Sequence, residues 1–206
     1  DLRIYCPSGK ARVIGLKPGD LVTEHLIEKV QTGADGLVSC CDNPQLLKLA
    51  VIERHHASGN IGLGLVKGFT QQGQCMHGAI GSTIAHDSHN IMVIGDNDAD
   101  MLEAVQALRR QQGGIVLIRD GQVVESLTLE IAGLMTSEPA KETARRKSRL
   151  IDVAHEKFHV VELIHPVMAL SLLSLTVIPF LRVTDSGLFD SEHFRFVNLD
   201  ATDSGQ

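Results

Sequence analysis

The sequence predicts an α+β domain in which mixed or antiparallel β-sheets are covered by helices. Three observations favour this class: short apolar or alternating runs bounded by glycine and proline, one strand–helix–strand unit, and several hairpin signals. The chain has 206 residues, of which 43% are hydrophobic and 21% are charged, so it can bury a sizeable core. Because it has no Trp, one Tyr and six Phe, that core has to be mostly aliphatic.

The first part of the chain predicts two short strands, around residues 11–14 and 21–23, separated by a turn at residues 18–20. The stretch 31–36 is short, polar and contains glycine, and it is the best candidate for a domain boundary. We therefore expect one unit to end near residue 32 and a second to span residues 33–206.

The next region predicts two strands. Residues 46–52 follow the turn signal Asn43-Pro44, and residues 61–66 alternate Ile or Leu with glycine. A strand with a bare glycine face is usually approached closely by another element or by a ligand. The glycine spacing is not GxGxxG, so the fingerprint for dinucleotide binding is missing.

The middle of the chain predicts a strand–helix–strand unit. Residues 91–94 form a buried strand, and residues 96–98 supply N-cap candidates for a helix that ends at residues 113–114. The apolar stripe of this helix is expected to consist of Met101, Leu102, Val105 and Leu108. Residues 115–118 and 123–129 then form a hairpin around Asp120-Gly121.

The clearest helix opens at Ser137-Glu138-Pro139, which supplies a cap, an acid and a proline in the first turn. Its narrow apolar seam is expected to follow Ala140, Ala144, Lys147, Ile151, Ala154 and Phe158, with one charged step. Residues 160–181 are strongly apolar but are interrupted by charged residues and prolines. They are expected to form a buried segment, since a membrane-spanning helix needs about 20 uninterrupted apolar residues.

Charge and cysteine content exclude several classes. The net charge of −6 does not favour a nucleic-acid backbone, and stacking platforms for single strands need aromatic residues that this chain lacks. The four cysteines, Cys6, Cys40, Cys41 and Cys75, include no CxxC and are expected to be reduced thiols in a cytoplasmic protein. The first residues do not have the pattern of a signal peptide, so none is expected.

Five consecutive polar residues, His86, Asp87, Ser88, His89 and Asn90, precede the strand at 91–94. A carboxylate beside an imidazole can fix its tautomer and raise its basicity, and the neighbouring serine and asparagine can contact a substrate edge. The alternative is a polar turn that caps the strand. As a metal site the cluster is incomplete, because zinc usually needs three or four ligands.

The other histidines form no complete catalytic set. His55 and His56 are adjacent and would point to opposite faces of a strand, so we expect a strand end at the surface. His155, His159 and His165 are scattered and are interpreted as structural or exposed. The sequence contains no HExxH, GxSxG, HxH or Walker motif.

Six segments resemble the C-terminal part of bacterial-type adenine deaminase, namely residues 12–24, 53–69, 78–101, 113–124, 132–140 and 169–190, and the most specific is AHDSHN at 85–90. The resemblance implies membership of the amidohydrolase superfamily, in which a (β/α)₈ barrel and a flanking β domain precede this part. Residues 1–32 would then be the tail of the flanking domain. The implied reaction is hydrolysis of adenine to hypoxanthine and ammonia by a metal-bound hydroxide.

The resemblance also implies roles. The divalent metal (Mn or Fe) belongs to the barrel, and none is expected in this chain. The 86–90 loop would reach the barrel's active-site mouth, with His86, Asp87 and His89 as catalytic residues and with Ser88 and Asn90 as substrate-binding residues. The implied partners are adenine, the N-terminal barrel and a second copy of the chain in a homodimer, with no nucleic acid and no membrane.

Two other functions remain open on the sequence alone. One is a non-catalytic module that caps the barrel and mediates dimerisation, which would require residues 160–181 to be exposed. The other is a self-contained metal hydrolase that uses His86, Asp87, His89 and a remote ligand.

Overall fold

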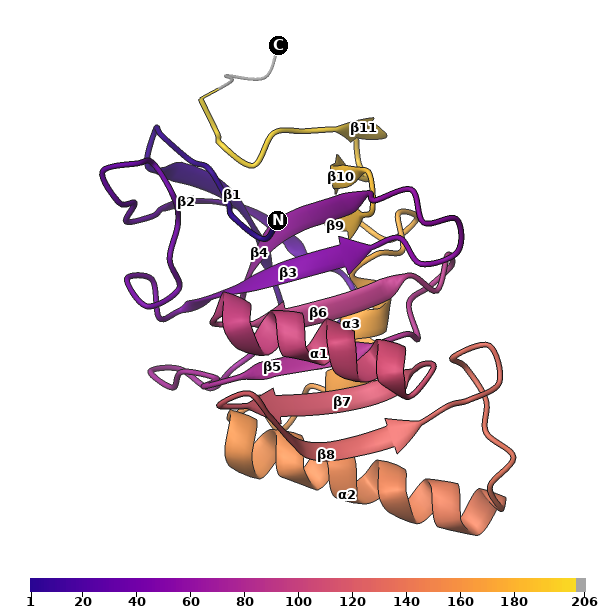
Figure 1. Ribbon diagram of the computed structural model, residues 1–206. Helices are drawn as coiled ribbons and strands as arrows, with labels where there is room; N and C mark the ends of the chain where they lie inside the picture. The colour runs from indigo at the N-terminus through magenta and orange to yellow at the C-terminus, as the bar shows by residue number, and fades with distance from the viewer. Residues whose placement is uncertain (203–206) are drawn as a thin grey trace.

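A computed structural model describes residues 1–202 of the chain, and it shows an α+β fold built on one large sheet (Figure 1). Eight strands lie in the order β2-β1-β4-β3-β6-β5-β7-β8. Their bounds are β1 Lys10–Gly15, β2 Glu24–Lys29, β3 Leu46–Ile52, β4 Ile61–Lys67, β5 Ala79–Ser82, β6 Ile91–Gly95, β7 Gly114–Arg119 and β8 Gln122–Thr128. Among these described strands β1 and β4 pair in parallel and the other neighbours are antiparallel, so the predicted fold class is confirmed.

Three helices cover the sheet and a small second sheet packs beside it. The helices are α1 Asp98–Arg110, α2 Ala140–Phe158 and α3 Pro166–Leu172. The second sheet has the order β11-β10-β9, with bounds β9 Leu181–Thr184, β10 Gly187–Asp190 and β11 Arg195–Phe196. Figure 1 shows α1 in front of the large sheet, α3 behind it, and α2 along the β8 edge.

Alternate residues of the central strands face different helices, which divides the core into layers. Ala50, Val93 and Val116 cluster with residues of α1, whereas Leu49 and Met92 cluster with residues of α2 and α3. This separation follows from the two-residue period of a strand. Since both faces of the sheet are covered, β6 is buried along its whole length, and this is why residues 91–94 form a continuous apolar run.

The expected strand at residues 21–23 is wrong, because β2 begins at Glu24. Val22 donates its N–H to the Asp20 carboxylate in a turn, and Thr23 donates its N–H to the carbonyl of Pro179. The backbone of this stretch is therefore used by a turn and by the C-terminal part of the chain instead of by a strand ladder.

Helix α1 begins as predicted, with Asn97 as N-cap accepting from the N–H of Asp100. Its stripe differs from the expectation, because Leu102 is 53% exposed and Ala104 is buried in its place. Two glycines of the sheet allow α1 to approach closely, since a Cβ on Gly81 would lie 3.3 Å from Cβ of Ala104 and one on Gly95 would lie 2.8 Å from Cγ of Met101.

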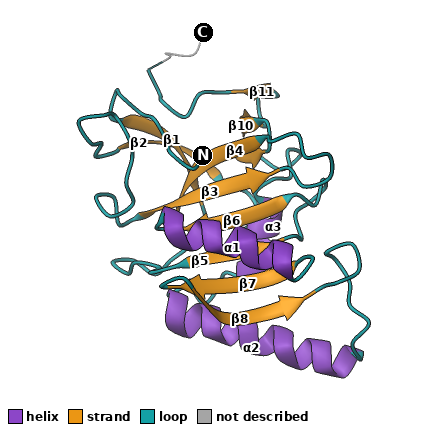
Figure 2. Cartoon of the chain, viewed as in Figure 1, coloured by secondary structure: helices purple, strands orange, loops and turns teal. Residues whose placement is uncertain are grey.

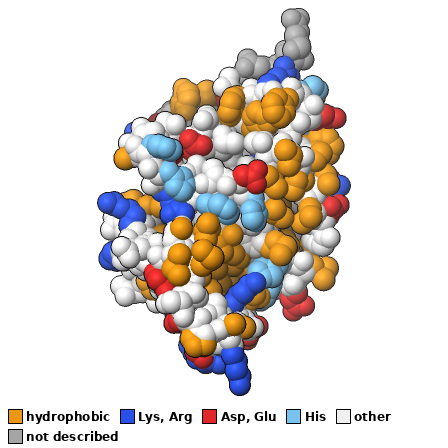
Figure 3. All heavy atoms as spheres, turned by 90° about the vertical axis from the view of Figure 1, so that its right-hand side faces the viewer, with side chains coloured by type: hydrophobic (Ala, Val, Ile, Leu, Met, Phe, Trp, Pro, Cys, Tyr) orange, Lys and Arg blue, Asp and Glu red, His pale blue; other side chains and the backbone are white. Residues whose placement is uncertain are grey.

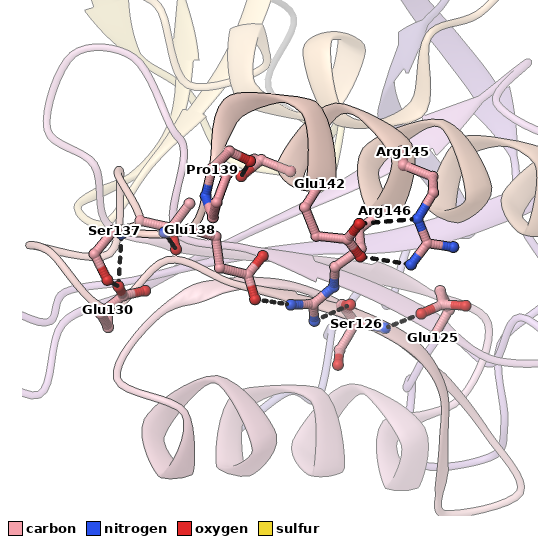
Figure 4. Close-up of polar contacts among 11 residues, drawn as sticks. Glu125, Ser126, Glu130, Ser137, Glu138, Pro139, Glu142, Arg145 and Arg146 are labelled. Atoms are coloured by element: carbon pink, nitrogen blue, oxygen red, sulfur yellow. Dashed lines mark hydrogen bonds and ion pairs between the residues drawn. The ribbon is translucent and has the colours of Figure 1, made fainter.

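Helix α2 differs from the expectation at its start. Its N-cap is Pro139, which makes no side-chain cap bond, and the Ser137 hydroxyl donates to the Glu130 carboxylate at 2.7 Å (Figure 4). The predicted apolar seam is confirmed only in the second half of the helix, where Ala154 and Phe158 are buried together with Leu150.

The first half of α2 is stabilised by charge instead of burial, since Ala140, Ala144 and Lys147 are exposed. Figure 4 shows Arg146 pointing back to Glu138, at 2.6 Å, and Arg145 pointing to Glu142. Residues 143–149, TARRKSR, therefore form a partly solvated face that is stabilised by ion pairs.

Residues 160–181, which were expected to form a buried segment, are buried only in part: nine of the 22 are buried, eight are half-buried and five are exposed. Three large apolar side chains in this segment are well exposed: Leu163, Met168 and Val177. Among residues 1–202, no helix combines the length and apolar character needed to cross a bilayer.

The division into residues 1–32 and 33–206 stays a prediction. The first 32 residues contribute β1 and β2 to the large sheet, in which β1 pairs with β4. The four cysteines, all within the described part of the chain, are free, as expected.

The bare glycine face of β4 is approached by another element, β9. A Cβ placed on Gly62 would lie 1.7 Å from the carbonyl oxygen of Thr184, and one on Gly64 would lie 2.6 Å from Cγ2 of Val183. The predicted close approach is thus confirmed, and the two sheets touch where side chains are missing.

Replacing Gly62 by alanine is expected to lower the free energy of unfolding by about 2 kcal/mol, because the new methyl group overlaps backbone that cannot rotate away. Thermal unfolding should show a loss of about 4–8 °C in Tm. The matched control is Gly59→Ala, where φ is +80° but the space is open, so only backbone strain of about 1 kcal/mol applies. A Gly62→Ala protein as stable as the Gly59→Ala protein would contradict the steric account.

Candidate functional site

Loops that follow strands β3, β5 and β8 meet at one end of the sheet. The register places Ile52 of β3 opposite Ile91, Ser82 of β5 opposite Met92, and Thr128 at the end of β8 opposite Gly114. Residues 53–60, 83–90 and 129–139 therefore leave the sheet on the same side, drawn as teal loops on the right of Figure 2. The 83–90 segment, called the histidine loop below, holds the five predicted site residues.

The histidine loop brings its two imidazoles together at the surface. The ring centroids of His86 and His89 lie 5.4 Å apart with an interplanar angle of 65°, and both residues are half-buried. Asp87 and Ser88 between them are exposed. Figure 3 shows histidine side chains gathered near the centre of this face, with hydrophobic side chains beside them.

The tautomer of His89 follows from a bond within the loop. The Ala85 N–H donates to Nδ1 of His89 at 3.3 Å, so Nδ1 carries no proton and the neutral ring has its proton on Nε2. The His89 N–H donates back to the Ala85 carbonyl at 2.6 Å. His89 has φ +51° and thus closes a tight turn while its Nε2–H remains available to a ligand.

The surroundings of His89 lower its pKa below the ordinary value of 6.5. Burial is the largest cause, followed by the positive charges of His86 and Arg54, while Asp87 acts in the opposite direction. A ring with a lowered pKa is neutral at pH 7. His89 is therefore a hydrogen-bond donor there, and it accepts a proton only at more acidic pH.

Two groups after β3 anchor the loop from one side. Arg54 donates from Nε to the carbonyl of His89 at 2.6 Å, and Nε2 of His55 lies 2.7 Å from the carbonyl of Ser88. The interpretation of residues 54–56 as a strand end at the surface was incomplete, because two of the three contact the candidate site. A cation and an imidazole directly after a buried strand were the available signal.

The C-terminal part of the chain anchors the loop from the other side. The His86 N–H donates to the carbonyl of Ser171 at 3.0 Å, and the Ser174 hydroxyl donates to the carbonyl of His86 at 2.7 Å. Ser174 is buried, and a buried hydroxyl in an apolar segment needs such a partner, while the Ser171 hydroxyl donates to the carbonyl of Met168. His86 and His89 are thus held through their own backbone groups, which leaves the positions of both imidazoles fixed.

Thr83 joins the histidine loop to the segment after β8. Its hydroxyl donates to the carbonyl of Gly133 at 2.6 Å and accepts the N–H of Gly114 at 2.7 Å. Exposed Ile131 and Met135 belong to the same segment, and an isolated bridge joins these two residues. This face therefore combines imidazoles, a carboxylate and apolar side chains.

Asn90 lies apart from the other predicted site residues, because it is only 3% exposed at the base of the loop. Its Oδ1 is buried and has no hydrogen-bond partner within residues 1–202. The substrate-binding role predicted for Asn90 stays a prediction. Ser88, by contrast, is exposed at the tip.

The histidine loop does not have the ligand geometry of a metal centre. Over the described residues, potential ligand atoms converge within 4.8 Å in one group of three, Asp190, Glu192 and His193, which lies at the end of β10. Asp190 there accepts the N–H groups of Glu192 and His193, which accounts for the cluster as a turn.

Comparison with known families gives one match that covers most of the chain. The model of the family described as the adenine deaminase C-terminal domain matches residues 20–195.

Three curated relatives illustrate the similarity. The adenine deaminase of Nitratidesulfovibrio vulgaris (strain DP4) is 48% identical over 197 residues, which cover 96% of this chain and 33% of that protein. The adenine deaminases of Clostridium acetobutylicum and Brucella anthropi are 43% and 42% identical, over 96% and 95% of this chain and 34% and 33% of their own lengths. The chain thus spans about a third of the length of these relatives.

Proposed function

The chain belongs to the adenine deaminase C-terminal domain family, and we propose that it is the C-terminal part of an adenine deaminase that hydrolyses adenine to hypoxanthine and ammonia in purine salvage. The identity of 42–48% over nearly the whole chain supports this. The remaining two thirds would include an amidohydrolase barrel. The protein would act in the cytoplasm, as a homodimer.

The metal of such an enzyme, manganese or iron, would lie on the barrel. When bound there it supplies the activated water of the hydrolysis. The histidine loop does not offer a converging set of ligands, so its residues are assigned to contacts with the substrate and to proton positioning.

The arrangement of His89 and Asp87 carries the proposal for this site. A neutral His89 with its proton on Nε2 can donate to a ring nitrogen of the purine. The exposed Asp87 carboxylate can accept from the exocyclic amino group, which leaves as ammonia. His86 is packed against His89 and completes the catalytic set, with Ser88 and Asn90 as substrate-binding residues.

Replacing Asp87 by alanine in the longer protein is expected to lower kcat/KM for adenine at least about tenfold, because a hydrogen bond to a charged group is lost. Steady-state kinetics with adenine measures this. Asp152→Ala, which removes an exposed carboxylate on α2, is the control and should leave kcat/KM unchanged. Wild-type kinetics for a folded Asp87→Ala protein would remove Asp87 from the site.

A second candidate is a non-catalytic module that caps the barrel and mediates dimerisation. The exposed Leu163, Met168 and Val177 favour it. An adenine deaminase assay of the barrel with and without this chain supplied in trans separates the two. Activity of the barrel alone at the full rate would support the capping module, and dependence on the chain would support the histidine loop.

A self-contained metal hydrolase is the third candidate. It requires stoichiometric metal bound to the 206-residue chain together with activity. Metal analysis of the purified chain tests it, and His86, Asp87 and His89 are the ligands whose replacement would have to abolish the binding.

A further inference from the structure

Arg54 joins two of the three loops that surround the candidate site. Its Nε donates to the carbonyl of His89 at 2.6 Å, and its Nη2 donates to the carbonyl of Ala132 at 2.8 Å. Residues 89 and 132 are far apart in the sequence, and one planar guanidinium spans both carbonyls. The position of the His89 backbone is thereby coupled to the segment after β8.

The guanidinium fits against a position that has to be glycine. A Cβ on Gly133 would lie 3.1 Å from both Nη1 and Nη2 of Arg54 and 3.0 Å from Oγ1 of Thr83. Gly133 also has φ +73°, which side chains rarely adopt. The site of Arg54 is therefore built for a flat, forked cation, which lysine cannot imitate.

The charge of Arg54 is not neutralised by an ion pair in the described part of the chain, since no carboxylate lies within 4.0 Å of it. Burial lowers its pKa from 12.5, but the group stays charged at neutral pH. The other titratable groups that act on His89 are His86, Asp87 and His55. Among them only Asp87 favours a protonated His89.

We propose that Arg54 is a positioning residue for His89, which fixes the carbonyl of the loop and, through its charge, disfavours a second cation on the neighbouring imidazole. This role rests on the proposed function of the histidine loop in adenine deamination. Arg54 itself need not touch the substrate, because it acts through the backbone and the protonation state of His89.

Two variants separate the geometric effect from the charge effect. Arg54→Gln removes both the charge and the guanidinium donors that bind the two carbonyls, while Arg54→Lys keeps a charge and removes the paired donors. Arg145→Gln is the matched control, because Arg145 is 67% exposed and pairs with Glu142 within α2 instead of with the histidine loop.

NMR titration of the His89 imidazole in the 206-residue chain provides the first readout. In Arg54→Gln the midpoint should move to higher pH, because a repelling charge is gone, whereas in Arg54→Lys it should stay close to the wild-type midpoint. Amide exchange of His89, whose N–H donates to Ala85, should be faster in both variants. Unchanged midpoint and exchange in Arg54→Gln would overturn the proposal.

Kinetics of the longer protein with adenine provide the second readout. Arg54→Gln should lower kcat/KM at least about tenfold and shift the acidic limb of its pH profile to higher pH. Arg54→Lys should have its acidic limb at the wild-type pH, but its kcat/KM should stay as low as that of Arg54→Gln. A shifted His89 midpoint in a protein with no deaminase activity would contradict the proposed function alone. An unshifted acidic limb in an active Arg54→Gln enzyme would overturn the role of Arg54.

Discussion

Replacing His89 by glutamine in the longer protein is expected to lower kcat/KM for adenine about 100-fold, which is the lower range for a lost acid–base group. Glutamine can keep a hydrogen-bond donor but cannot exchange a proton near neutral pH. The substitution also removes the acceptor of the Ala85 N–H and should cost about 1 kcal/mol of stability. Steady-state kinetics together with thermal unfolding measures both effects.

The pH dependence provides a sharper form of the same prediction. Burial and the neighbouring cations lower the pKa of His89, so the folded ring binds fewer protons than the unfolded ring near pH 6.5. The stability contributed by the neutral ring is therefore complete above 6.5 and is lost as the pH falls through the lowered pKa. The acidic limb of kcat/KM should lie below 6.5, and it should disappear in His89→Gln.

His56→Gln is the control for His89→Gln. The His56 side chain is 87% exposed and lies 3.5 Å from the Glu53 carboxylate, so its replacement should change kcat/KM less than about twofold. If the two variants had the same kinetics, the histidine loop would not contribute to the chemistry.

Replacing Arg182 by alanine is expected to lower the free energy of unfolding by about 4 kcal/mol, because a fully buried side chain with five hydrogen bonds is lost. Its acceptors are Thr23 Oγ1 and the carbonyls of Leu21, Leu175, Pro179 and Leu181. Burial lowers the pKa of Arg182 to about 10, so the group remains charged at pH 7. Without it, several buried carbonyls lose their donors.

Thermal unfolding of the 206-residue chain measures this effect, and a loss of about 8–16 °C in Tm is expected. Arg145→Ala, which removes an exposed ion pair, should change the stability by less than about 1 kcal/mol. Equal Tm values for the two variants would show that the hydrogen bonds of Arg182 to residues 21–23 and 175–181 do not stabilise the fold.

The local elements followed from the sequence because their signals are local. Asn97 caps α1 through its own third neighbour, and the alternation of glycine with Ile and Leu marks β4. Ser137 failed as a cap because Glu130, seven residues earlier, takes its hydroxyl. Leu102 failed as a core residue because it lies outside the buried face of the helix, which consists of Asp100, Met101, Ala104, Ala107 and Leu108.

The candidate site was foreseen only in part. The five polar residues 86–90 and the likeness to one family could be seen in the sequence, and the family is confirmed by comparison with known proteins. For Arg54 and His55 the sequence showed only a cation and an imidazole after a buried strand, and for Ser171 and Ser174 it showed no signal, since each contacts the loop across at least 30 residues of sequence.

The sequence by itself determined the fold class, most strands and helices, the family, and the cluster of histidines before β6. Periodicity and capping act within a few residues, so a linear pattern is enough for these. The tertiary structure decided that Arg54 and Ser174 hold the histidine loop from opposite sides and that Arg182 is buried. The strand order sets those contacts, because it brings together the ends of β3, β5 and β8, and no local pattern encodes that order.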